Sequence, residues 1–112
     1  MTSPTYERLR RDLITAMSQR DMVAVSAIRT AVAAIDNAGA VEAQHSAAPI
    51  GAGGFSPDVP RRELDEKAVA QILEAEIEER RTAMATLADL GQDSHVERLQ
   101  REVEVLVRYL AE

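Results

Sequence analysis

The sequence predicts an all-α protein of four helices in two antiparallel hairpins, joined by a long loop rich in glycine and proline. Three observations predict this fold class. Apolar residues recur at steps of three and four in four segments, alanine is the commonest residue, and glycine and proline concentrate in one stretch. We expect a single domain with a first hairpin at 1–39, a linker loop at 40–61 and a second hairpin at 62–112.

The first hairpin has start and stop signals as well as apolar stripes. Ser3 can cap the first helix, and Pro4 suits its first position. Asp21 can cap the second helix, which we expect to end just before Gly39. The break between the two helices is short, so they should pack antiparallel. The stripes are Tyr6, Leu9, Leu13 and Met17, then Val25, Ile28, Val32 and Ile35.

Helical periodicity disappears between residues 40 and 60. A connection of more than about 12–15 residues without secondary structure is usually functional or mobile. We therefore expect a disordered loop in which only Phe55 packs back onto the bundle. Residues 51–55 could instead cradle a phosphate, but the required preceding strand and the Gly-Lys-Ser/Thr ending are both missing from the sequence.

The second hairpin is predicted from a helix over about residues 64–90, a turn at Gly91 and a last helix that opens at Ser94. Ser94 and Glu97 match the Ser-x-x-Glu capping box, in which each side chain satisfies a free backbone amide. The regular steps are typical of an antiparallel packing seam. The stripes are Val69, Leu73, Ile77, Met84 and Leu87, then Val96, Leu99, Val103, Leu106 and Leu110.

Composition and charge exclude several classes of protein. The 112 residues contain no cysteine, which excludes a disulfide framework, a thiolate zinc site and a cysteine nucleophile. No segment approaches the ~18 apolar residues of a membrane span, and no secretory signal pattern is present. We therefore expect a cytoplasmic location. The net charge of −6 disfavours a generic binder of polyanions.

Residues that could carry chemistry are few. His45 falls in the predicted loop and His95 in the first turn of the last helix, so neither has a second ligand at metal-binding spacing. No serine or threonine lies in a nucleophile motif. The carboxylates of residues 74–79 are followed directly by two arginines, which is typical of a charged helix face. We expect no catalytic residue, no metal and no cofactor.

Arg80 is the most informative charged residue, because it falls within the apolar stripe of the third helix. An arginine there needs a partner, and both Glu76, one turn earlier, and Glu102, on the facing helix, are within reach. Arg29 lies similarly beside the stripe of the second helix. The two arginines could form structural ion pairs, or they could contact an anion or a partner.

The order of these segments resembles the GatB/YqeY family. The likeness consists of an arginine in the second helix with an asparagine near its end, an arginine pair, a glycine turn and a Glu-x-x-x-Leu-x-x-Tyr-Leu ending. It covers most of residues 5–38 and 62–110. The matching residues are Asp21, Arg29, Asn37, Arg80, Arg81, Gly91, Glu102, Leu106, Tyr109 and Leu110.

The resemblance implies an all-helical domain related to the C-terminal region of the B subunit of tRNA-dependent amidotransferases. In those enzymes the glutaminase chemistry resides in another subunit, and the related helical region contacts tRNA. Free-standing members carry the label of glutamine-dependent carbon–nitrogen ligase. For this chain the resemblance implies a non-catalytic accessory domain of bacterial translation that binds tRNA or an amidotransferase-related protein.

Two departures from the family pattern bear on this expectation. Family members usually continue after the Tyr-Leu pair into a small helical domain associated with tRNA, so the resemblance implies a short form. The 40–60 connection is also longer than usual. Residues 1–30 are nevertheless locally basic, with five arginines against three acidic residues. The candidates for contact with tRNA or a partner are Arg8, Arg11, Arg29, Arg80 and Arg81.

A protein-interaction or homo-oligomerising module without nucleic-acid binding is the alternative function. Val105 and Val107 add apolar surface to the last helix, and Val23 does so on the second helix. One packing seam does not need these residues, so a homodimer could bury them. An enzyme in its own right would need a nucleophile and an oxyanion site, and the sequence shows neither.

Overall fold

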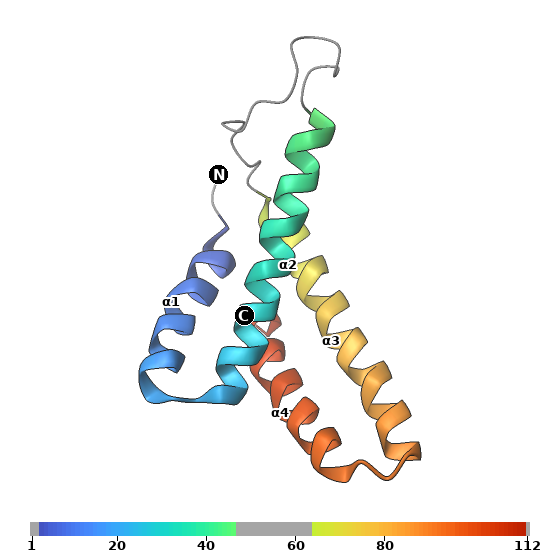
Figure 1. Cartoon of the computed structure of the whole chain (residues 1–112). Helices are drawn as coiled ribbons and strands as arrows, with labels where there is room; N and C mark the ends of the chain where they lie inside the picture. The colour runs from blue at the N-terminus through green and yellow to red at the C-terminus, as the bar shows by residue number, and fades with distance from the viewer. Residues whose placement is uncertain (1–2, 47–63, 112) are drawn as a thin grey trace.

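The computed structural model describes residues 3–46 and 64–111, and every regular element in these ranges is an α-helix (Figure 1). Helices α1 (Pro4–Gln19) and α2 (Met22–Ser46) form one antiparallel hairpin. Helices α3 (Glu66–Asp89) and α4 (Asp93–Leu110) form the other. Helices α2 and α3 each contact all three other helices. The predicted all-α fold is confirmed.

The core lies where the two hairpins meet. Its largest fully buried side chains come from α1, α3 and α4, while α2 contributes several buried alanines that allow its neighbours to approach closely. Burying one large aliphatic side chain is worth about 1.5–3 kcal/mol, so this cluster is a main source of stability. The large side chains are Leu9, Val69, Leu73 and Leu106, and the alanines are Ala24, Ala27 and Ala31.

Both predicted N-terminal caps of the first hairpin are confirmed. The Ser3 hydroxyl accepts a hydrogen bond from the Tyr6 amide at 3.1 Å, and Pro4 occupies the first turn of α1. A carboxylate oxygen of Asp21 accepts from the Ala24 amide, also at 3.1 Å. Between the helices Arg20 takes the left-handed conformation with φ of 56°, which reverses the chain.

Helix α2 continues past its predicted end. Gly39 is buried inside the helix rather than ending it, and the helix runs to Ser46. Gly39 falls one turn after the buried Ile35, so it extends the packed stripe, and the flanking alanines at 38 and 40 favour helix. His45 therefore lies in the last turn of α2, which corrects its placement in a loop. The expectations for Phe55 and residues 51–55 lie outside the described residues.

Helix α4 begins before its predicted capping box. Asp93 is its first residue, and Gln92 occupies the cap position without a side-chain hydrogen bond. Ser94 and Glu97 are therefore inside the helix, and the capping-box prediction is wrong. Gly91 explains the earlier start, because its φ of 73° reverses the chain directly after α3 and the next helix can begin two residues later.

The buried face of α1 rotates toward its end. Met17 was expected in the stripe but is exposed, and the neighbouring Ala16 is buried instead. The reversal at Arg20 brings the end of α1 close to the start of α2, and Ala16 is the residue of this last turn that is buried there.

Candidate binding site

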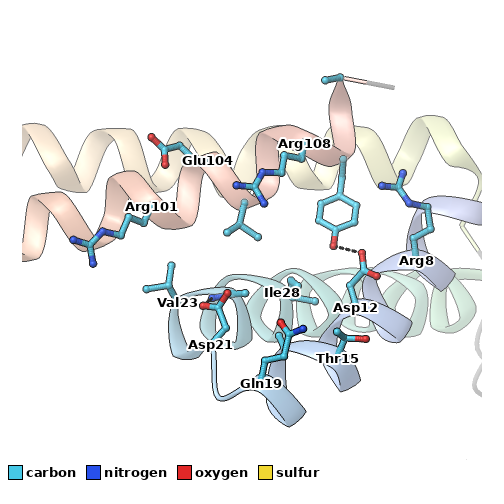
Figure 2. A pocket seen from close by; sticks show the side chains of 15 residues that line it. Arg8, Asp12, Thr15, Gln19, Asp21, Val23, Ile28, Arg101, Glu104 and Arg108 are labelled. Carbon is cyan, nitrogen blue, oxygen red and sulfur yellow. Dashed lines mark hydrogen bonds between the residues drawn. The ribbon is translucent and has the colours of Figure 1, made fainter.

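An open groove of about 820 Å³ runs between α1, the start of α2 and α4 (Figure 2). It has an apolar floor and charged walls. Its α1 wall carries Arg8 and Asp12, and its α4 wall carries Arg101, Glu104 and Arg108. The other lining residues are Thr15, Ala16, Gln19, Asp21, Val23, Ala24, Ile28, Val105, Tyr109 and Ala111.

One end of the groove is closed by a contact between α1 and α4. The Tyr109 hydroxyl donates a hydrogen bond of 2.6 Å to a carboxylate oxygen of Asp12 (Figure 2). The Arg8 guanidinium lies 5.0 Å from the centre of the Tyr109 ring, within cation–π range. Burial, with a smaller effect of Asp12, raises the pKa of Tyr109, so its hydroxyl stays protonated and remains a donor.

The α4 wall of the groove carries a row of exposed charges. Glu97, Arg101, Glu104 and Arg108 follow one another at steps of four, three and four, which places them along one side of the helix. All four are exposed, and none forms an ion pair with any residue in the described ranges. We call these four residues the α4 charge stripe.

Arg80 occupies the structural position that its place in the stripe predicts. Its Nε atom lies 3.0 Å from Glu102 across the α3–α4 interface, and a terminal nitrogen lies 3.3 Å from Glu76. The same terminal nitrogen donates to the Glu76 carbonyl oxygen at 3.0 Å. Arg98 approaches Glu102 at 3.8 Å from the solvent side. The pair of Arg80 and Glu102 holds α3 and α4 together, and both side chains are buried.

The other predicted arginines are not gathered in one place. Arg8 lines the groove, whereas Arg11 on α1 and Arg29 on α2 are exposed outside its lining. Within the described ranges Arg29 forms no ion pair. Its side chain is exposed. Arg81 is exposed and approaches Glu78 at 3.6 Å.

Sequence reasoning missed the polar contacts between the hairpin elements. Tyr6 donates to Asp36 within the first hairpin, and Tyr109 donates to Asp12 across nearly the whole chain. Burial and Asp36 raise the pKa of Tyr6 as well. The sequence did contain a signal for these hydrogen bonds, because Tyr6 and Tyr109 lie beside apolar stripes. A tyrosine hydroxyl in such a position usually finds a hydrogen-bond partner. Which aspartate each would reach depended on the crossing of the helices.

Among the described residues no group of three His, Asp or Glu side chains could hold a metal ion. None of the helices in the described ranges is long and apolar enough to cross a bilayer.

No protein-family model, curated protein or solved structure matches the chain. Function therefore has to be argued from the residues and their geometry.

Proposed function

We propose that this protein is a non-catalytic accessory domain that binds tRNA or an amidotransferase-related protein, as its resemblance to the GatB/YqeY family implies. On this proposal any amide-transfer chemistry belongs to partner subunits. The order of the four helices, the arginine in α2 and the Tyr-Leu ending of α4 support it. The Arg80–Glu102 pair contributes by fixing the angle between α3 and α4.

The observation that carries the proposal is the exposure of the arginines on the first hairpin. Arg11 and Arg29 form no ion pair with any described residue, although the molecule as a whole is acidic. Exposed arginines without carboxylate partners can contact phosphates without first breaking an ion pair. The acidic second hairpin would repel the RNA backbone, so these charges would orient tRNA toward the first hairpin.

A charge-reversed variant, Arg11→Glu/Arg29→Glu, tests this proposal by titration with tRNA at several salt concentrations. If about three phosphates are contacted, affinity of the unchanged protein should fall about 20- to 40-fold between about 50 and about 200 mM salt. The variant should bind more weakly, and its salt slope should be smaller by about 1.5.

The matched control is Lys67→Glu/Arg81→Glu, which makes the same change in charge on α3. It should lower the affinity much less, because Lys67 is not a candidate contact and Arg81 already has a carboxylate partner in Glu78. Equal losses in the two variants would show that only net charge matters, and that would contradict a binding face on the first hairpin. Circular dichroism confirms that both variants keep their helices.

A second candidate function is a protein-interaction or homo-oligomerising module. Large apolar side chains are exposed at both ends of the first interhelical turn and elsewhere, which favours it. The residues are Ile14, Met17, Met22, Val41, Leu90 and Val107. Sedimentation of the protein alone over a range of concentrations tests this function, because self-association raises the mean mass with concentration and a monomer does not.

A further inference from the structure

We propose that a second copy of this chain docks on the α4 charge stripe, so that two α4 helices pack antiparallel about a two-fold axis. The proposal rests on the second candidate function, self-association, and is independent of tRNA binding. It names the surface and the partner for that function.

The proposed dimer rests on a symmetry in the α4 charge stripe. Its spacing of four, three and four is the same in both directions, while the signs alternate as Glu97, Arg101, Glu104 and Arg108. In an antiparallel pair with its axis between residues 102 and 103, Glu97 faces the Arg108 of the second copy. Arg101 likewise faces the second copy's Glu104. Every residue of the stripe then meets an opposite charge, as a two-fold interface requires.

The α4 charge stripe is available to a second copy because its residues form no ion pairs within the described part of the chain. Glu97 and Arg101 are spaced to pair within the helix, as are Glu104 and Arg108, yet neither pair lies within ion-pair distance in the described structure. Other arginines of the second hairpin do have carboxylate partners, such as Arg98 with Glu102. The stripe therefore differs from an ordinary helix face stabilised by internal pairs.

Apolar side chains border the stripe on both sides. Val105 is half-buried at the groove, and Val107 is 37% exposed on the opposite side. Exposed ion pairs alone add little affinity, and a stable dimer usually buries about 800 Å² on each partner. The two valines, together with entry of the second copy's side chains into the open groove beside α4, supply further contact. The charges then determine register and orientation.

Sedimentation equilibrium of charge-swapped variants tests the interface. Arg101→Glu places two like-charged pairs across the axis, so the dimer dissociation constant should rise at least about tenfold. Glu104→Arg should have the same effect. The double variant Arg101→Glu/Glu104→Arg restores opposite charges at every position and should dimerise within about threefold of the unchanged protein.

Arg11→Glu is the matched control, because it makes the same change in charge as Arg101→Glu on an exposed residue outside the stripe. It should leave the dimer unchanged. A monomer at all concentrations would overturn both this inference and the self-association function. A dimer that Arg101→Glu does not weaken, or that the double variant does not restore, would overturn this interface while leaving self-association in place.

Discussion

At the scale of single residues, the contact between Arg80 and Glu102 links two helices through a buried charge. The Nε atom of Arg80 donates to Oε1 of Glu102 at 3.0 Å. A terminal guanidinium nitrogen of Arg80 donates to a carboxylate oxygen of Glu76. Removing one member of a buried pair leaves the other charge without compensation, which costs more than the pair itself contributes.

Replacing Arg80 by leucine should therefore lower the free energy of unfolding by about 2–4 kcal/mol, because Glu102 stays buried and, among the described residues, keeps only Arg98 at 3.8 Å as a cationic partner. The double variant Arg80→Leu/Glu102→Leu removes both charges and should be less destabilised than the single variant. Urea unfolding of both variants measures the difference. A double variant at least as unstable as Arg80→Leu would show that the pair matters through packing rather than charge.

Tyr109 offers a second test at this scale, because its ring and its hydroxyl make different contacts. Tyr109→Phe keeps the ring beneath Arg8 but removes the hydrogen bond to Asp12. The expected loss is about 1–2 kcal/mol, since the bond is to a charged acceptor that water can still reach. Thermal or urea unfolding would reveal it. An unchanged midpoint would mean that Asp12 is equally well satisfied by solvent.

At the scale of helices, hydrogen bonds join the N-terminal end of α1 to the N-terminal end of α3. Glu66, in the first turn of α3, accepts from Ser3 and from Thr5 of α1. Ser3 therefore has two roles, as the cap of α1 and as a donor to α3. Ser94 looked like a cap in the sequence but lies inside α4 without that role.

The two serines should respond differently to the same substitution. Ser3→Ala should lower the free energy of unfolding by about 1–2 kcal/mol, because a cap and a link between helices are lost. Ser94→Ala should change it by less than about 0.5 kcal/mol, as expected for an exposed residue inside a helix. Denaturant titrations of the two variants provide the comparison. A large cost for Ser94→Ala would mean that the capping box forms after all.

Glu66 predicts a pH dependence for the same link. The hydrogen bond from Ser3, assisted by Thr5, lowers the pKa of Glu66 in the folded protein. Its stabilising effect is then fully present above about pH 4.3, the ordinary glutamate value, and is lost as the pH falls through the lowered pKa. The stability difference between the unchanged protein and Glu66→Gln should therefore shrink on acidification. Glu74→Gln, at an exposed position on the same helix, should show no such trend.

At the scale of the whole molecule, periodicity was enough to predict the hairpins and most of the core. The apolar steps identified Leu9, Leu73 and Leu106, and the position of Arg80 in its stripe identified Glu102 as a partner. Predictions of helix ends from local sequence signals failed where tertiary packing determined whether the helix continued. Gly39 is typical of a helix end in the sequence but is buried inside α2 in the structure.

The groove could not be predicted for a related reason. Its walls come from α1 and α4, at opposite ends of the chain, and the contact between Tyr109 and Asp12 depends on how these helices cross. The alternating α4 charge stripe was visible in the sequence. Only the structure shows that the four residues of the stripe do not form ion pairs with one another and are therefore available to a partner.

The proposed function is tested most directly by sedimentation velocity of the unchanged protein mixed with total tRNA, at about 50 and about 200 mM salt. The exposed arginines of the first hairpin predict a complex at low salt that largely dissociates at high salt. If tRNA sediments at the same rate with and without the protein at both salt concentrations, direct tRNA binding is contradicted.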